Sequence, residues 1–584
     1  MTLKKSFCVV VLICSVAAQA FWGQGPQSTQ LAPANDPFAL SPGSSFSASG
    51  KGNRTIESGI RPAAISADLE EALQIIESNY VSRKALNLEA LTGSAISTML
   101  HALDPHSRFY NQAEFQELLG EHESEYSGTG SSIAGFENNG AIDTYVISTF
   151  PGSPAAKAGL RFGDRIIAVN GRAVAGASPD IVRDLVRGTR GTTVRLTVER
   201  AASLGVQTIE MRRDRVHEPA VPKGFLVRGK TGYIDLTAGF SNATFGEFES
   251  AVNDLKRRGM TSLVLDLRGN GGGILDQAVK VAEKFLPSGA TIVSQRGRYS
   301  DDVRIWKAAR PQYESMPLVL LVDENTASAS EVLAGALQDN DRALILGRRT
   351  FGKGLVQSVL NLPEGAGLTL TAARYYTPTG RSIQRDYAAT GLYDYYNHRN
   401  AEIDKPLFAA KTPTNRVVYG GDGIAPDESA VDTELTPERI RLLDPIFFFS
   451  RELTAGRFEK DPVLGQAFTI ERLRQRAIFG QPIVDEQVSG QFEEFLHRYK
   501  DQRFYLESIK GERAFVRQML GYYIALGAFG TEAASRARIE SDPQIDQAIK
   551  ALPKAAELYA AALKATPASK KQKSSLSLVL SEQR

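Results

Sequence analysis

LVLLVDENTASASEVLAGALQDNDRALILGRRTFGKGLVQ, residues 318–357, is the stretch that decides the fold. Residues 318–322 form a short, continuously apolar run, which is typical of a strand covered on both faces. A helix is expected to open at Ser328-Ala329-Ser330-Glu331, and a second apolar strand is expected at residues 343–346. Strands and helices also alternate around this stretch, so the pattern predicts an α/β core.

The same stretch brings a serine and a lysine together. Ser328 lies at the first turn of the predicted helix, where unpaired N–H groups and the helix dipole favour developing negative charge. Lys353 has glycine on both sides, which allows a close approach to the serine. We predict Ser328 as a nucleophile and Lys353 as its general base. Ser330 is the competing serine, but a helical start turns it to another side of the helix.

Other nucleophiles and bases fit less well. Cys8 and Cys14 are the only cysteines, and both lie in the first twenty residues. None of the six histidines falls between residues 218 and 397, so a Ser-His-Asp triad would need a histidine from another domain. His106 is interpreted as a structural turn residue. A buried lysine, whose pKa is lowered, is the simpler base.

Two glycine-bearing turns resemble phosphate loops but lack essential residues. Residues 347–354 match GxxxxGK, yet Gly354 stands where a Ser or Thr would hold Mg²⁺. Residues 269–273 follow a strand and precede a helix, but Ile274 replaces the third glycine of a dinucleotide fingerprint. The second turn still offers backbone N–H groups for an oxyanion. We expect no cofactor and no metal.

The chain begins with a predicted signal peptide, residues 1–20, in which Lys4 and Lys5 precede an apolar run that ends in Ala18-Gln19-Ala20. Cleavage after about Ala20 would give an exported protein, periplasmic or secreted; without cleavage the segment would be a membrane anchor. The mature chain would have no thiol. With 68 basic and 66 acidic residues, no global charge points to nucleic acid.

A β-rich region is predicted at residues 125–215. It contains a Gly-rich turn, Gly128-Thr129-Gly130-Ser131, then Gly152-Ser153-Pro154-Ala155 and Gly163-Asp164 with Val169-Asn170-Gly171. A helix at residues 179–187 is expected before a last strand at residues 193–200. This series resembles a PDZ domain. The resemblance implies that residues 128–131 hold the carboxylate of a peptide that is added as a strand; a spacer without ligand is the alternative.

The remaining chain divides by composition and periodicity. We predict a multidomain α+β protein with a flexible leader (21–61), an all-helical N-terminal unit (62–124), the PDZ-like domain (125–215), the α/β core (216–427), a C-terminal helical region (428–566) and a disordered tail (567–584).

Further motifs extend the pattern in chain order, namely Leu103-Asp-Pro-His-Ser107, Asp266-Leu-Arg-Gly-Asn-Gly-Gly-Gly273, Thr350-Phe-Gly-Lys353-Gly-Leu-Val-Gln357 and Gly423-Ile-Ala-Pro-Asp427. With the Ser328 motif they resemble the C-terminal processing (tail-specific) proteases over about residues 65 to 427. The resemblance implies a crotonase/ClpP-like protease core and a Ser328–Lys353 dyad, and the family position is the reason for preferring Ser328 over Ser330. It also implies that Gln357 orients the lysine and that the N–H groups of Gly272 and Ala329 form the oxyanion hole. Gly271 departs from the family, which usually has proline there.

The sequence therefore predicts an exported serine endopeptidase that recognises free, apolar protein C-termini. Its expected partners are protein or peptide substrates. An adaptor protein and a homo-oligomer are further possible partners, and no nucleic acid is expected. Two alternatives stay open, a catalytically silent PDZ adaptor and a crotonase-like acyl-CoA or ligand-binding protein.

Overall fold

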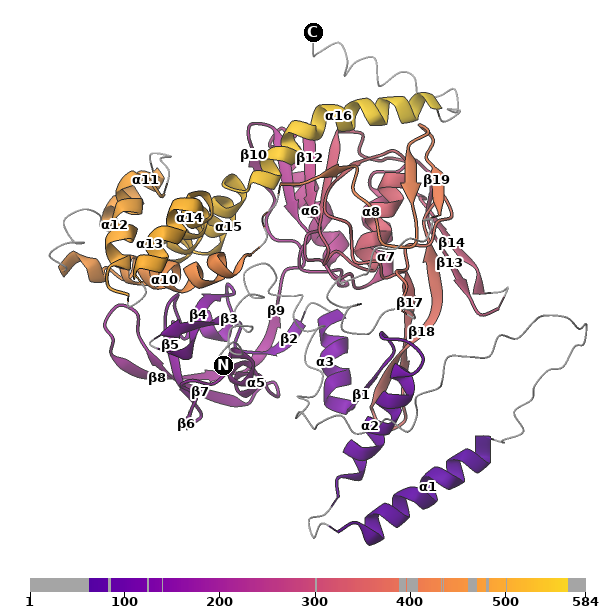
Figure 1. Ribbon diagram of the computed structural model, residues 1–584, viewed down its shortest axis with the longest axis horizontal. Helices are drawn as coiled ribbons and strands as arrows, with labels where there is room; N and C mark the ends of the chain where they lie inside the picture. Colours follow the sequence, from indigo (N-terminus) through magenta and orange to yellow (C-terminus); the bar gives the residue numbers. More distant parts are fainter. Residues whose placement is uncertain are drawn as a thin grey trace, which may run out of the picture.

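The computed structural model describes residues 62–565 except 82–85, 123–124, 139, 300–301, 388–394, 396–407, 432, 434, 461–469, 479–482 and 500–501. The predicted signal peptide, leader and tail lie outside these residues. A β-rich unit lies below a larger α/β core, and a group of helices covers both (Figure 1). No helix among the described residues combines the length and the apolar character that crossing a membrane requires.

The core is built on a six-stranded sheet whose strands follow the order β10-β11-β12-β15-β16-β21. All neighbours are parallel except β10 and β11. The strands are β10 (Phe225–Val227), β11 (Thr231–Asp235), β12 (Ser262–Asp266), β15 (Leu318–Val322), β16 (Leu344–Gly347) and β21 (Glu428–Ser429). The predicted buried strand at 318–322 is confirmed, and all five of its residues are buried.

Helices cover both faces of this sheet, which is why its strands are continuously apolar. One face packs on α6 (Thr244–Arg257), α7 (Leu275–Glu283) and α8 (Ala329–Asp339). The other face packs on α16 (Pro543–Ala565), which crosses the top of the core in Figure 1. The α/β class is therefore confirmed, and the C-terminal helical region supplies one of its two layers.

A second, antiparallel sheet lies beside the core and carries the segment after Lys353. Its order is β1-β18-β13-β14, with β17 also paired to β18. The strands are β1 (Arg108–Tyr110), β13 (Thr291–Gly297), β14 (Arg304–Lys307), β17 (Leu355–Asn361) and β18 (Gly367–Tyr376); β19 (Ala409–Lys411) and β20 (Val417–Tyr419) form a separate hairpin.

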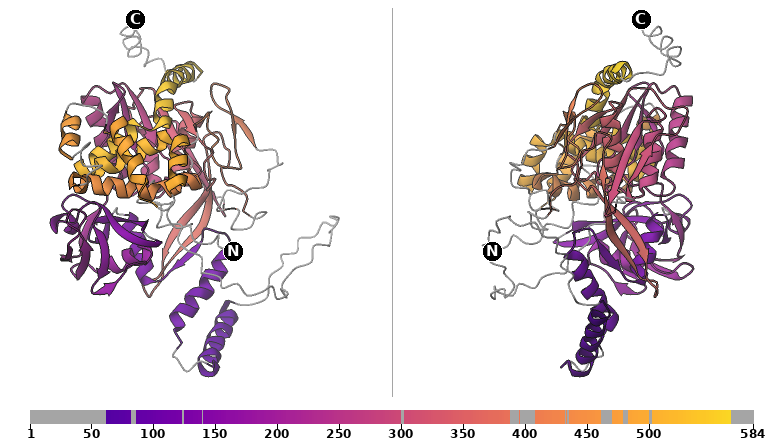
Figure 2. Two further views of the ribbon diagram at one scale, coloured as in Figure 1. Left: turned by 60° about the vertical axis from the view of Figure 1, so that its left-hand side comes forward. Right: turned by 90° about the vertical axis from the view of Figure 1, so that its right-hand side faces the viewer.

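The predicted N-terminal helical unit is confirmed, but it is not all-helical. Between α2 (Leu88–His101) and α3 (Gln112–His122), β1 pairs with β18 of the core. Three residues carry too little periodicity to be read as a strand, and their partner lies far along the chain. The preceding helix, α1 (Pro62–Asn79), extends away from the core in both views of Figure 2, and its Leu69 and Ile76 are exposed.

The β-rich unit contains a sheet of order β3-β4-β5-β7-β8, with β6 paired to β5. Residues 193–200 are not its last strand, which corrects the prediction: β8 and β9 follow, and β9 pairs with β2. In β8 only Ile209 and Met211 are buried, so its alternation is weak. The elements are β2 (Glu125–Gly128), β3 (Ser131–Asn138), β4 (Ala141–Thr149), α4 (Pro154–Lys157), β5 (Arg165–Val169), β6 (Arg172–Ala173), α5 (Pro179–Val186), β7 (Thr193–Glu199), β8 (Val206–Arg212) and β9 (Asp214–His217).

The C-terminal helices pack on the β-rich unit of their own chain. Phe136 of β3 stacks on Phe447 with ring centroids 3.7 Å apart, and Tyr145 packs edge-on against the same ring. Arg451 Nε donates to the Gly163 carbonyl at 2.6 Å. The helices are α10 (Pro437–Thr454), a 3₁₀ turn (Arg457–Lys460), α11 (Ile470–Ile478), α12 (Glu486–Leu496), α13 (Gln502–Gly511), α14 (Arg513–Phe529) and α15 (Thr531–Glu540).

Candidate active site

The turn after β15 is locked to the turn after β12, and this places Ser328 next to Gly272. Thr326 Oγ1 donates to the Leu267 carbonyl at 2.9 Å, and the Gly269 N–H donates to Asp323 Oδ1 at 2.9 Å. Because β12 and β15 are parallel neighbours, their C-terminal turns meet at one edge of the sheet. Ligands of open α/β sheets bind at such edges.

Ser328 is the more accessible of the two candidate serines. It is the N-cap of α8 and has φ 56°, in the left-handed region that side chains rarely adopt. It is only partly buried, whereas Ser330 is fully buried. The Ser330 hydroxyl has no hydrogen-bond partner among the described residues. Burial therefore distinguishes the two serines, and the assignment of Ser328 as the nucleophile remains a prediction.

Glu331 joins the serine to the lysine loop. Its buried carboxylate accepts the Ser328 N–H at 2.9 Å and the Lys353 N–H at 2.8 Å. It also accepts the Gly352 N–H at 2.8 Å and the Thr350 hydroxyl at 2.6 Å. Burial raises the pKa of Glu331, against the hydrogen bonds that favour its charged form. Glu331 is not among the site residues predicted from the sequence, although Ser-x-x-Glu at a helix start is a recognisable capping signal.

The surroundings of Lys353 make its neutral amine more available near physiological pH. Burial lowers its pKa to about 8, although the carboxylates of Asp104 and Glu331 act in the opposite direction. Arg108 adds to the lowering. A lysine with such a pKa can act as a general base, which an exposed lysine cannot do at neutral pH.

Gly272 lies against the nucleophile. A β-carbon added there would be 2.8 Å from Ser328 Cβ and 3.0 Å from the Ala329 nitrogen, so the structure brings these three residues together. The Ala329 N–H has no acceptor among the described residues. The Gly272 N–H donates to Asn270 Oδ1 at 2.9 Å. One of the two predicted oxyanion donors is therefore free, and the other has an intramolecular partner.

Gln357 lies in β17, after the lysine loop. Its Nε2 donates to Thr371 Oγ1 at 2.6 Å, and its buried Oε1 has no hydrogen-bond partner among the described residues. A buried acceptor without a partner is costly, so it has a strong tendency to bind a nearby cationic donor. That Gln357 orients Lys353 remains a prediction.

Residues 128–131 connect β2 to β3, as the peptide-binding prediction requires. Gly130 has φ 74°, and a β-carbon there would lie 2.4 Å from Ser153 Cβ. The Ala155 N–H donates to the Thr129 carbonyl at 2.8 Å, and the Ser153 hydroxyl donates to the Gly130 carbonyl at 3.1 Å. β3 is an edge strand of its sheet, so its outer edge suits an added peptide strand.

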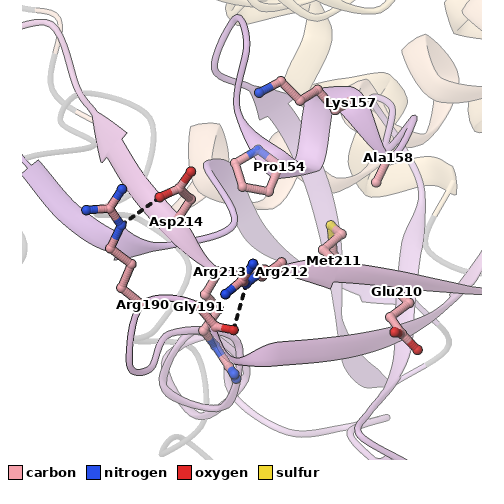
Figure 3. Close-up of a pocket in the computed structure, with 10 residues that line it drawn as sticks. All are labelled: Pro154, Lys157, Ala158, Arg190, Gly191, Glu210, Met211, Arg212, Arg213 and Asp214. Atoms are coloured by element: carbon pink, nitrogen blue, oxygen red, sulfur yellow. Dashed lines mark hydrogen bonds and ion pairs between the residues drawn. The ribbon is translucent and has the colours of Figure 1, made fainter.

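A separate cavity of about 730 Å³ opens between α4, β8 and β9 of the same unit (Figure 3). Arg190 Nε donates a hydrogen bond to Asp214 Oδ1 at 2.8 Å, and Arg212 Nε donates one to the Gly191 carbonyl at 2.9 Å. Two of the arginine side chains that line the cavity are therefore hydrogen-bonded to other residues of its wall. All its lining residues belong to the β-rich unit rather than to the core that carries Ser328 and Lys353. Among the residues that the structure describes, no group of three or more His, Cys, Asp or Glu could hold a metal ion.

Comparisons with known proteins agree with this architecture. Residues 230–390 match the model of peptidase family S41, and residues 150–200 match a PDZ domain. The carboxy-terminal-processing protease of Bartonella bacilliformis is 38% identical over 301 residues, which are 51% of this chain and 68% of that protein. The chloroplastic C-terminal processing peptidase of Tetradesmus obliquus is 35% identical over 326 residues, with 53% and 69% covered.

Among solved structures, a photosystem II D1 C-terminal processing protease shares 32% identity, covers 65% of this chain and 90% of its own, and has a TM-score of 0.34. The PDZ and S41 matches define the molecule as a serine-type peptidase that carries a PDZ domain. The chain belongs to the carboxy-terminal processing protease family.

Proposed function

We propose that the protein is an exported endopeptidase that captures the free C-terminus of a polypeptide in its PDZ domain and cleaves the chain through a Ser328–Lys353 acyl-enzyme mechanism. The observation that carries this proposal is the Glu331 carboxylate, which holds the backbones of Ser328 and Lys353 at the same time. The lowered pKa of Lys353, about 8, supports its role as base.

In this mechanism the Ser328 hydroxyl attacks the scissile carbonyl while Lys353 Nζ takes its proton. The N–H groups of Gly272 and Ala329 bind the tetrahedral oxyanion. Lys353 then gives the proton to the leaving amine, and water, activated by the neutral lysine, hydrolyses the acyl-enzyme. Gln357 orients the lysine through its amide oxygen.

Substrate capture rests on the PDZ domain. The edge strand β3 offers backbone groups to an extended peptide, and residues 128–131 offer N–H groups to its terminal carboxylate. The names of the relatives refer to carboxy-terminal processing, which agrees with this orientation of the substrate. Peptide binding would also bring the catalytic groups into register. Export predicts that the mature N-terminus lies near Phe21, which N-terminal sequencing checks.

The test is cleavage of casein and of a tagged peptide by the wild type, Ser328→Ala and Lys353→Ala. Loss of a catalytic residue of this kind lowers kcat by about 10⁴-fold or more. Equal rates for all three proteins would contradict the mechanism and favour a silent PDZ adaptor. Coenzyme A binding without cleavage would favour a crotonase-like enzyme. Equal rates on substrates with a free and an amidated C-terminus would contradict capture by the PDZ domain.

A further inference from the structure

The segment Leu103–Ser107, between α2 and β1, contacts the strand that pairs with the one after Lys353, although it is far from both in sequence. β1 pairs with β18, with Arg108 opposite Thr369. β18 pairs in turn with β17, the strand that follows Lys353. Asp104 is 6% exposed and Ser107 is fully buried, which is unusual for polar residues in a connecting loop.

A continuous set of hydrogen bonds runs from Asp104 to Gln357. Asp104 Oδ1 accepts the N–H groups of His106 and Ser107, each at 2.8 Å, and Oδ2 accepts the Ser107 hydroxyl at 2.7 Å. The Ser107 oxygen accepts the Thr371 N–H at 3.1 Å. Thr371 Oγ1 accepts Gln357 Nε2 at 2.6 Å. One end of the Gln357 amide is therefore held by a chain of bonds that begins at a carboxylate.

Asp104 is held as an anion. Burial raises its pKa, but the hydrogen bonds from Ser107 and His106 outweigh burial, and the net pKa is lowered. The three donated hydrogen bonds favour the ionised form of the Asp104 carboxyl group. The segment thus introduces a fixed negative charge next to the base.

The charges that face Lys353 come from three elements. Asp104 acts from the loop, Glu331 from α8 and Arg108 from β1, and the two carboxylates favour the ammonium form. His106 adds no charge, because burial and the charge of Lys353 lower the pKa of its imidazole to about 3. Its Nε2 lies 2.8 Å from the Tyr395 hydroxyl. The positive charge of Arg385 also lowers the pKa of His106.

We propose that Asp104 is a positioning residue for the general base: its hydrogen-bond chain through Ser107 and Thr371 fixes the Gln357 amide, and its negative charge acts on the base. This inference rests on the proposed Ser328–Lys353 mechanism. The competing explanation is that Asp104 only caps its own turn, since Asp often bonds to the N–H two residues on.

Asp104→Asn separates the two explanations because asparagine keeps an acceptor oxygen for the turn and removes the charge. Without the charge the neutral amine forms at lower pH, so the rising limb of the kcat–pH profile moves to lower pH. We expect the rate at pH 6.5, relative to the plateau of each enzyme, to increase about threefold, equivalent to a shift of about half a pH unit. The assay uses a short peptide without groups that titrate between pH 5.5 and 9.5.

Asp302→Asn is the matched control. Asp302 also caps a turn, through the Tyr299 N–H at 2.9 Å, but is exposed and does not act on Lys353. The rising limb of the kcat–pH profile of Asp302→Asn should lie at the same pH as that of the wild type. An unmoved limb in a folded Asp104→Asn enzyme would overturn the inference and leave Asp104 as a turn cap.

Ser107→Ala tests the hydrogen-bond chain independently of the charge. It removes the bond to Thr371 and leaves Asp104 ionised, so we expect kcat to fall about tenfold with KM and the limb unchanged. Unchanged kcat would overturn the positioning role even if Asp104→Asn does not fold. Full activity of Ser328→Ala or Lys353→Ala would instead refute the mechanism itself, so the two failures are distinguishable.

Discussion

The two halves of the active site differ in how completely they are assembled. On the nucleophile side, Glu331 accepts bonds from Ser328 and from the loop of Lys353, and the serine backbone is held in a strained conformation. On the oxyanion side, the Ala329 N–H is free but the Gly272 N–H is bonded to Asn270. The predicted nucleophile and base are therefore already tied together by hydrogen bonds, whereas the predicted oxyanion hole needs a local rearrangement of Gly272.

Asn270 is well placed to retain the Gly272 N–H. The Asn270 side chain is fully buried and also donates to the Leu236 carbonyl, while the backbone carbonyl of Asn270 accepts the Ala327 N–H at 2.9 Å. The Gly272 carbonyl accepts the Phe240 N–H at 2.7 Å, which holds the other side of the same residue. To bind an oxyanion, the Gly272 N–H must leave Asn270 or be shared with it. The binding energy of the substrate can offset the cost of breaking the Gly272–Asn270 bond. The new bond to the oxyanion forms only in the transition state, so it raises the rate.

Among the residues that hold the two halves in place, the largest effect is expected at the assembled half, for Glu331→Ala. The change leaves the buried N–H groups of Ser328, Gly352 and Lys353 without their acceptor, and each such group costs about 1–3 kcal/mol. We expect kcat to fall by about 10³-fold or more and the melting temperature to fall by several degrees. Peptide cleavage and thermal unfolding measure the two. Near-normal kcat would show that Glu331 does not hold the pair together.

A smaller but still severe effect is expected at the oxyanion half, for Gly272→Ala. The added β-carbon would lie 2.8 Å from Ser328 Cβ and 2.9 Å from the Ala327 carbonyl, at φ 104°, which disfavours any side chain. Alanine keeps the N–H, but the clash would displace it from the oxyanion, and an oxyanion donor that no longer reaches its acceptor lowers kcat by about 10²- to 10³-fold. Gly271→Ala is the matched control, because a β-carbon there meets nothing within 4 Å. Similar kcat values for the two variants would argue against a role of Gly272.

The pH dependence tests whether the base is prepared before substrate binds. Since burial lowers the pKa of Lys353 to about 8, the neutral amine increases as pH rises, and kcat/KM should increase about tenfold from pH 6 to pH 7 and level off above 8. Lys353→Arg keeps the positive charge but cannot lose its proton, so it should be inactive throughout. A profile that is flat between pH 6 and 9 would exclude Lys353 as the base in the free enzyme.

The sequence predicts the local part of this site well. The strand at 318–322 and the helix beginning at Ala329 follow from periodicity within one short stretch, whereas the preference for Ser328 over Ser330 rests on the family resemblance and stays a prediction. The PDZ domain follows similarly from glycine turns and alternation. Each of these features depends on residues that are neighbours in the chain.

The contacts that join distant segments could not be predicted. No pattern around residues 103–110 reveals that β1 pairs with β18, or that Asp104 acts on Lys353. The stacking of Phe136 on Phe447 could not be predicted either, because the sequence around each aromatic residue indicates only that it is buried and not which residue it contacts. The Asn270–Gly272 bond is local, but it depends on backbone angles that glycine leaves open.

Gly271 offers the finest test of the comparison, with the smallest expected effect. It precedes Gly272 where the resembling proteases usually have proline, and the space for a side chain is open. Proline would restrict the loop before substrate binds, and substitutions of this kind are worth about 0.4–1 kcal/mol when the backbone already fits. We therefore expect Gly271→Pro to raise kcat about twofold to fivefold, with KM unchanged, on a short peptide.

The gain should require a free Gly272 N–H, because a stiffer loop is useful only if it favours the oxyanion-binding arrangement. A fall in kcat would show instead that proline stabilises the bond to Asn270, and that the flexible glycine is what allows the hole to form. Either sign identifies which arrangement the loop favours. Gly271→Ala should lie close to the wild type, since alanine neither removes the N–H nor fixes φ. The direction of this small change therefore decides whether the oxyanion half is limited by flexibility or by its bond to Asn270.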